Sequence, residues 1–136
     1  MTPRGWSDDL SVGVEAVDAE HRELIEHLEG LRRAHAAGQG GLVSALDALI
    51  DATHRHFENE EAAMARSSYP QLADHVRSHI ELSSRVLQIR QRLAAGDVST
   101  LGFELLGFLD GWLLDHIRTA DRAFGAFLAG GGRAED

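Results

Sequence analysis

The chain has 136 residues, of which 43% are hydrophobic, and this is enough for a single domain with a hydrophobic core. It contains no cysteine, which excludes disulfides, zinc–thiolate sites and iron–sulfur clusters. The formal net charge of −9 argues against a nucleic acid or an anionic membrane surface as partner. No apolar run approaches the ~20 residues of a membrane-spanning helix, and the first residues lack the pattern of a signal peptide, so we expect a cytoplasmic protein.

Helices dominate the predicted secondary structure, because only two prolines interrupt long stretches rich in Ala, Leu, Glu and Arg. An N-terminal arm, about 1–17, is expected to be extended and packed on the rest. Apolar residues then recur at helical spacing in four segments, about 18–37, 42–66, 70–95 and 99–118, before a polar tail at about 129–136. Pro70 suits the first turn of the third segment. The short connections predict an all-α fold: a single domain over 1–136, built as an up-down-up-down four-helix bundle with an extended N-terminal arm.

Histidines lie on the inward side of every predicted helix. The first helix has His21, the third has His75 and His79 one turn apart, and the fourth has His116. The second helix has His56 and, one turn later, the carboxylate of Glu60.

Taken singly, each of these side chains has an ordinary interpretation. A lone histidine on an apolar face is usually a hydrogen-bonded core residue, and Glu60 alone could pair with an arginine at the rim. Burying all of them without partners would cost several kcal/mol. Side chains four residues apart on a helix project side by side, so two such pairs converging on one point have the geometry of metal ligation.

Asp121 follows His116 by five residues, a spacing that turns it ~140° away on a regular helix and moves it ~7.5 Å along the axis. If both side chains bind one centre, the helix must end or bulge between Ile117 and Ala120. The alternative is a solvated aspartate in the last helical turn. With Asp121 included, five imidazoles and two carboxylates are too many for one tetrahedral zinc and suit two ions that share carboxylate bridges. Such ligands are compatible with Fe, Mn, Co, Ni or Zn.

Four sequence segments match a known family, in its order and with similar spacing over nearly the whole chain. They are "VGVEAVDAEH" ending at His21, "HFENEE" from His56, "YPQLADHVRSH" ending at His79 and "WLLDHIRTAD" ending at Asp121. With these segments the chain resembles the hemerythrins, most closely the single-domain bacterial hemerythrins. The resemblance implies a four-helix bundle with a non-haem di-iron centre, bridged by an oxo or hydroxo group, that binds O₂ reversibly.

The resemblance also implies a role for individual residues. One iron would be held by His75, His79 and His116, and the second, with an open position for O₂, by His21 and His56, while Glu60 and Asp121 bridge the two. The wall of an apolar O₂ pocket would consist of Leu24, Phe57, Trp112, Leu113 and Ile117, although core packing would explain these residues equally well.

Some positions depart from the family pattern. The stretch "RSSYP" places Ser68 where the family usually has a glycine just before the tyrosine. The family motif has no place for His27, His35 and His54, which we interpret as surface or hydrogen-bonded histidines. Asp18 could support His21 or cap the first helix.

The expected function is reversible O₂ binding for oxygen transport, storage or delivery. The expected protein partner is an oxygenase that receives the O₂ or a sensor protein. Catalysis is not expected. The alternatives are a di-iron redox enzyme that reduces peroxide, O₂ or NO, an O₂-sensing module, and a structural metal bundle. Oxygen-activating di-iron bundles use Glu-x-x-His pairs, and this chain contains none, which favours reversible binding.

Overall fold

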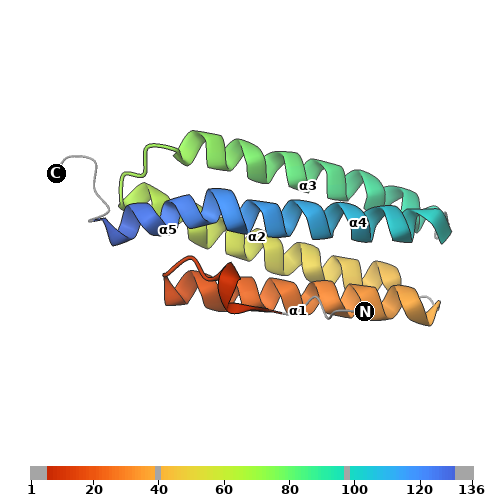
Figure 1. Ribbon diagram of the computed structural model, residues 1–136. Coiled ribbons are helices and arrows are strands. Elements are labelled where there is room, and N and C mark those ends of the chain that lie inside the picture. Colours follow the sequence, from red (N-terminus) through yellow and green to blue (C-terminus); the bar gives the residue numbers. More distant parts are fainter. Residues whose placement is uncertain (1–5, 39–40, 97–98, 131–136) are drawn as a thin grey trace.

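The computed structural model describes residues 6–38, 41–96 and 99–130, and nearly all of them are helical. The elements in chain order are a 3₁₀ turn Asp8–Leu10, α1 (Glu15–Ala37), α2 (Leu42–Arg66), α3 (Leu72–Ala94), α4 (Ser99–His116), a π-helical segment Ile117–Asp121 and α5 (Arg122–Ala129). Together α4, the π segment and α5 form one continuous rod (Figure 1).

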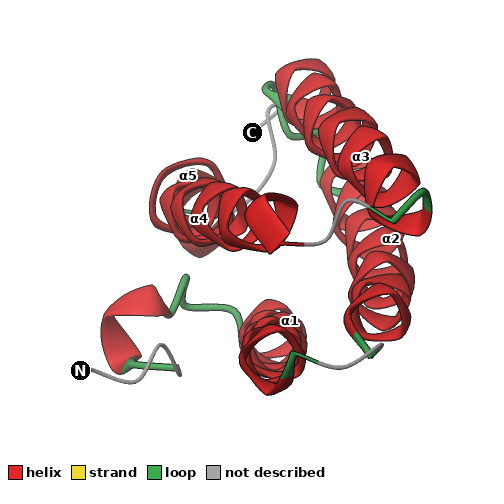
Figure 2. Cartoon of the chain, turned by 90° about the vertical axis from the view of Figure 1, so that its right-hand side faces the viewer, coloured by secondary structure: helices red, strands yellow, loops and turns green. Residues whose placement is uncertain are grey.

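Successive helices run in opposite directions (Figure 1), and the view along the bundle shows them around a common centre (Figure 2). Contacts join α1 to α2, α2 to α3, α3 to α4, and α4 back to α1. The predicted all-α, up-down-up-down bundle is therefore confirmed. This topology brings the start of α1, the end of α2, the start of α3 and the end of α4 to the same end of the molecule.

Aliphatic side chains fill the opposite end of the bundle. Leu31, Leu46 and Leu105, from α1, α2 and α4, are completely buried, and Ile89 of α3 is 1% exposed. Each lies on the apolar stripe of its helix. Burying such a side chain contributes about 1.5–3 kcal/mol relative to leaving it in water, so this end is stabilised by apolar packing.

The N-terminal arm is shorter and less extended than predicted. Its described part contains the 3₁₀ turn, and α1 begins at Glu15 instead of 18, while residues 1–5 of the predicted arm lie outside the described residues. The Asp18 carboxylate accepts hydrogen bonds from the Val12 amide (2.9 Å) and from the Ser11 hydroxyl (2.6 Å). Asp18 therefore binds the arm to the first turns of α1 and neither caps that helix nor hydrogen-bonds His21.

Helical structure also continues beyond the predicted end at 118. Phe124 of α5 is 1% exposed and packs on Met64 and Tyr69 in a small second core. Gly125 faces the arm so closely that a Cβ atom there would overlap the carbonyl oxygen of Val12. Because these contacts bury one side of α5, the chain stays helical to Ala129. Residues 131–136 of the tail predicted at about 129–136 lie outside the described residues.

The turn between α2 and α3 has the hydrogen bonds of a Schellman motif. The Tyr69 amide donates to the Met64 carbonyl (2.9 Å), and the Ser68 amide donates to the Ala65 carbonyl (3.2 Å). Ser68 has a φ of 58°, the left-handed conformation in which glycine is usual. Because this turn occupies the chain up to Gln71, Pro70 precedes α3, and that helix begins at Leu72 instead of 70.

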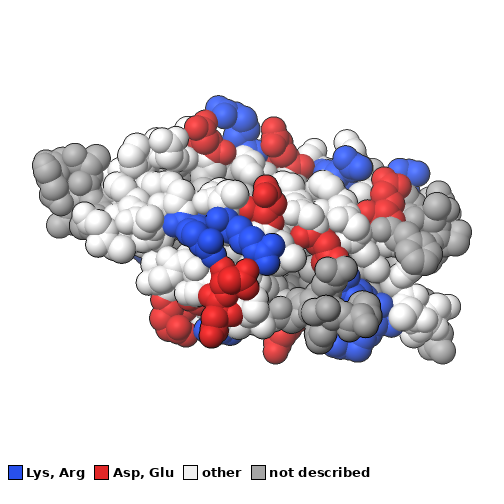
Figure 3. All heavy atoms as spheres, in the orientation of Figure 1, with Lys and Arg blue, Asp and Glu red and all other residues white. Residues whose placement is uncertain are grey.

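Basic and acidic side chains lie next to one another on the face of the molecule drawn in Figure 3. An ion pair joins Arg118 to Asp9 of the arm at 3.1 Å, and Arg122 donates to the Asp9 carbonyl. Within 6–38, 41–96 and 99–130, no helix is both long and apolar enough to cross a membrane.

Candidate metal centre

Seven predicted metal ligands lie together at the end of the bundle where the start of α1 meets the end of α4. Each is buried, with at most 6% of its surface exposed. Their donor atoms form two overlapping groups, and within each group the atoms lie within 4.8 Å of one another. The first group consists of Glu60, His75, His79, His116 and Asp121, and the second of His21, His56, Glu60 and Asp121.

In the first group, three imidazoles surround one oxygen of each carboxylate. His75 Nε2 lies 3.1 Å from Glu60 Oε1 and 2.8 Å from Asp121 Oδ1. His79 Nε2 lies 3.3 Å from the same Glu60 oxygen, and His116 Nε2 lies 3.2 Å from the same Asp121 oxygen. Five donors thus point at one small volume.

In the second group, the other oxygens of the two carboxylates face two imidazoles. His21 Nε2 lies 2.9 Å from Asp121 Oδ2, and His56 Nε2 lies 3.9 Å from Glu60 Oε2. Each carboxylate therefore directs one oxygen into each group, which is the arrangement that a bridging carboxylate needs.

The π segment explains how Asp121 joins His116 in spite of the five-residue spacing. A π-helix has i→i+5 hydrogen bonds and more residues per turn than an α-helix, so five residues complete about one turn. The segment covers Ile117–Asp121, and the Arg122 amide donates to the Ile117 carbonyl. The bulge expected between Ile117 and Ala120 is present, and it turns the Asp121 carboxylate inward, where it is 2% exposed.

Several buried donor atoms in these groups have no hydrogen-bond partner: both ring nitrogens of His21, Glu60 Oε2 and His79 Nε2. His21 Nε2 is close to Asp121 Oδ2 but is not aligned with it for a hydrogen bond. An unpaired polar atom in a protein interior costs about 1–3 kcal/mol. Two divalent cations would satisfy His21 Nε2, Glu60 Oε2 and His79 Nε2 and would offset the charges of both carboxylates, so the residues fit a pair of metal ions.

The two carboxylates are held in their charged forms. Burial acts to raise the pKa of Asp121, but the imidazoles of His116, His21 and His75 against its carboxylate hold that pKa well below the usual value. For Glu60, burial and the Asp121 charge act to raise the pKa, but the neighbouring imidazoles of His75 and His79 outweigh them, so its pKa is lowered.

When no cation is bound, the His75 imidazole carries a proton whose charge offsets part of the negative charge of the two carboxylates. Burial alone would lower the pKa of its imidazole, yet hydrogen bonds to Asp121 and Glu60 and the charges of both carboxylates raise it to about 9. The buried Tyr69 next to this group has a raised pKa because of its burial and the charges of Asp121 and Glu60.

Carboxylates outside the two groups bind the Nδ1 atoms of two imidazoles, on the side of each ring that faces away from the groups. His56 Nδ1 donates to Glu20 Oε1 (2.5 Å), and Asn59 donates to the other oxygen of Glu20 (2.8 Å). His79 Nδ1 donates to Glu61 Oε2 (2.7 Å). A carboxylate on one ring nitrogen fixes the tautomer and the orientation of the other, which then faces the ion.

A weaker contact of the same kind joins His116 Nδ1 to the Ser78 hydroxyl at 3.4 Å. Sequence reasoning did not find Glu20, Glu61 or Ser78. Glu61 directly follows Glu60, and Glu20 directly precedes His21. Adjacency to a predicted ligand is thus the one sequence feature that could have pointed to these two glutamates.

The predicted pocket residues lie in the core beside the two groups. The Phe57 ring stacks on His79 (centroids 3.6 Å apart, planes 5° apart), and the Trp112 ring stacks on His116 (4.4 Å, 13°). Leu24, Leu113 and Ile117 are buried in the main core, and Trp112 is half-buried against it. The stacked rings restrict the movement of the imidazoles they cover.

Three further histidines lie outside both groups, as expected. His27 Nε2 is 3.9 Å from Glu23, His54 Nε2 is 3.4 Å from the Ser83 hydroxyl, and the His35 ring packs against Gly102. They are exposed or partly exposed.

Comparison with known proteins agrees with this site. The family model "Hemerythrin HHE cation binding domain" matches residues 12–128, a span that includes all seven donors. The chain is 38% identical to a bacteriohemerythrin of Stenotrophomonas maltophilia over 120 residues, which are 88% of this chain and 77% of that protein.

Two further relatives are a bacteriohemerythrin of Pseudomonas aeruginosa (33% identity over 88% of this chain and 77% of the relative) and a myohemerythrin of Riftia pachyptila (29% over 88% and 89%). A family match over most of the chain, centred on a buried His/Asp/Glu cluster that can hold cations, shows that this protein belongs to the hemerythrin family.

Proposed function

We propose that this protein binds dioxygen reversibly at a non-haem di-iron centre and serves in oxygen transport, storage or delivery. His75, His79 and His116 would hold one iron, and His21 and His56 the other. Glu60 and Asp121 would bridge the two ions, in accord with the way each carboxylate directs one oxygen into each group.

One observation carries this proposal: the two donor groups are unequal. The first offers three imidazoles and two carboxylates, whereas the second offers only two imidazoles and the same two carboxylates. A site that binds an external ligand keeps one position free of protein donors. The shortage of one donor in the second group supports an open position there.

Ferrous ions in the two groups would supply the electrons that dioxygen takes up on binding and would recover them on its release. The protein residues keep this chemistry reversible by excluding water and protons from the site. Leu24, Phe57, Leu113 and Ile117 are each at most 6% exposed, and Trp112 covers His116. We propose that these five residues form the dry wall of the dioxygen pocket.

The test is an optical spectrum of purified, reduced protein of known iron content, recorded under argon, then in air, then under argon again. We expect two irons per chain and a visible charge-transfer band that appears in air and disappears when oxygen is removed. A stable oxidised spectrum that does not reverse would refute reversible binding and would favour a redox enzyme or a sensor.

A pair of variants in α1 tests the assignment of the second iron. His21→Ala removes a donor from the smaller group and should abolish dioxygen binding while the bundle stays folded. His27→Ala, on the same helix but outside both groups, should bind dioxygen normally. Full dioxygen binding by the His21 variant would contradict this assignment.

A further inference from the structure

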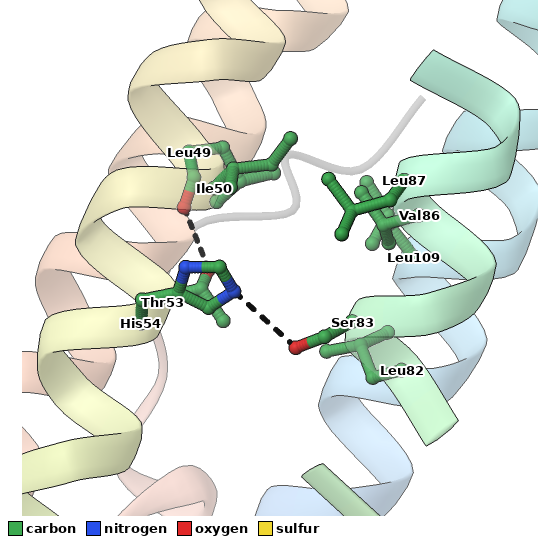
Figure 4. Close-up of a pocket in the computed structure, with 9 residues that line it drawn as sticks. All are labelled: Leu49, Ile50, Thr53, His54, Leu82, Ser83, Val86, Leu87 and Leu109. Atoms are coloured by element: carbon green, nitrogen blue, oxygen red, sulfur yellow. Dashed lines mark hydrogen bonds between the residues drawn. The ribbon is translucent and has the colours of Figure 1, made fainter. Parts of the chain in front are cut away.

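A small apolar cavity lies between α2, α3 and α4, in the layer next to the donor groups. Its aliphatic lining consists of Leu49, Ile50, Leu82, Val86, Leu87 and Leu109. The volume is about 20 Å³, and roughly 10–15 Å³ is enough for one water-sized molecule. Figure 4 shows the side chains of α2 and α3 facing each other across this space.

On α3 and α4, the wall of the cavity is one helical turn away from a residue of the site. Leu82 follows His79 by three residues on α3, and Leu109 precedes Trp112 by three residues on α4. Residues three or four apart on a helix are neighbours on the same face. On these two helices the cavity therefore lies one turn from the donor His79 and from Trp112, which stacks on the donor His116.

The polar groups of the cavity are already paired. The Thr53 hydroxyl donates to the Leu49 carbonyl (2.7 Å), and His54 Nε2 lies 3.4 Å from the Ser83 hydroxyl across the seam between α2 and α3 (Figure 4). A water molecule needs two to four polar partners to be stable in a cavity, and apolar cavities stay dry. The interior therefore favours a small apolar molecule over water.

A surface groove lies outside the seam and shares His54 and Ser83 with the cavity. Its hydrophobic lining residues are Phe57 and Ile80, which lie beside His79 and the carboxylates of Glu58 and Glu61. Among the described residues, Ile80 (62%) and Leu87 (43%) are the most exposed large hydrophobic side chains; Ile80 lines the groove and Leu87 lines the cavity. The contact between His54 and Ser83 thus lies where the groove meets the cavity.

We propose that this cavity binds a small apolar gas and is the access route of dioxygen to the metal centre, with the His54–Ser83 contact closing its mouth. The gas-binding part stands on the cavity alone, whereas the access role rests on the proposed function.

Xenon is the probe for the gas site, because it is apolar, binds in dry apolar cavities and does not need iron. We expect xenon in this cavity in crystals pressurised with the gas, in metal-free and in iron-loaded protein. A cavity that excludes xenon, or that holds an ordered water instead, would overturn the gas site whether or not the protein binds dioxygen.

Two substitutions at the half-buried Ser83 test the access role. Ser83→Trp should obstruct the mouth and Ser83→Ala should open it, whereas Gln88→Trp places the same bulk on an exposed position of α3 outside cavity and groove. A side chain that blocks the access route slows the entry and the exit of dioxygen by the same factor. The rates of dioxygen association and dissociation should therefore fall together several-fold in Ser83→Trp, rise together in Ser83→Ala, and leave the dissociation constant unchanged.

The outcomes separate the two proposals. Unchanged rates in both Ser83 variants, or a changed dissociation constant, would overturn the access role while reversible binding by the unmodified protein still supported the proposed function. Xenon in the cavity of an iron-loaded protein that does not bind dioxygen would overturn the proposed function and the access role, and would leave the gas site.

Discussion

The two ends of the bundle use the same four helices but are held together differently. At the aliphatic end, Leu31, Leu46, Ile89 and Leu105 meet with at most 1% of their surface exposed. At the polar end, seven histidine and carboxylate donors occupy the equivalent central positions. Apolar packing is favourable by itself, whereas buried polar groups are stable only when partners satisfy them. The aliphatic end is therefore stable through its own packing, and we expect the polar end to depend on bound cations.

The largest effect is expected from Glu60→Ala, because Glu60 contributes an oxygen to both donor groups. We expect the variant to lose nearly all metal, measured as iron per chain after reconstitution, while circular dichroism still shows a helical protein. Glu58→Ala, an exposed glutamate on the same helix, is the control and should keep full metal content. Two irons in the Glu60 variant would contradict the bridging role.

At the other end, Leu46→Ala should damage stability without changing the metal stoichiometry. Truncating a completely buried leucine costs about 2–5 kcal/mol of unfolding free energy, and Leu46 is 0% exposed. Chemical denaturation measures the loss. Ile80→Ala, at a 62% exposed position, should change stability by only about 0.5 kcal/mol. A loss of iron from the folded Leu46 variant would show that the two ends are not independent.

The pH dependence of stability should differ between the two metal states. The pKa of His75 is about 9 in the folded metal-free protein, against an ordinary value of 6.5. Its contribution to metal-free stability is therefore complete below pH 6.5 and is lost as pH rises through 9. Metal binding requires the neutral imidazole, so metal affinity should increase over the same range, by at most about 1.4 kcal/mol per pH unit for one released proton.

Melting temperatures of both forms between pH 6.5 and 9 check this prediction. The gap between the metal-loaded and the metal-free protein should widen as pH rises. A gap that stays constant would mean that His75 releases no proton when the metal binds.

The smallest effect is expected in the turn that leads from α2 into the polar end. A left-handed conformation costs a non-glycine residue about 1–2 kcal/mol, and the entropy of glycine in the unfolded chain offsets up to about 1 kcal/mol of the gain. Ser68→Gly should therefore stabilise the protein by about 0.5–1 kcal/mol in urea unfolding. Ser67→Gly, where φ is −95°, should bring no gain, and equal effects at both positions would exclude this explanation.

The helical spacing of the apolar residues was sufficient to predict the bundle and to predict that the seven donors lie at one end of it. Residues four apart share a helix face, and an up-down topology superimposes the start of one helix on the end of the next. The bulge near Asp121 was also predictable, because a spacing of five residues cannot serve one centre on a regular helix.

Contacts between helices were not predictable in the same way. Glu20 reaches His56, and Glu61 reaches His79, across helix pairs, and such contacts depend on helix rotation and side-chain conformation that spacing does not encode. Asp18 was misread because its partners, Ser11 and Val12, belong to an arm without helical periodicity. The helix after Asp121 was missed because its stability comes from the packing of Phe124 on Met64 and Tyr69.

Amide hydrogen exchange with and without metal tests the contrast between the two ends most directly. Exchange reports local opening along the chain. Removing the metal should greatly increase exchange near the donors, in residues 17–24, 56–64, 75–80 and 113–124, and should leave residues 28–35, 44–50 and 86–93 protected. Equal loss of protection at both ends, or no change at either, would contradict the conclusion that cations hold only the polar end.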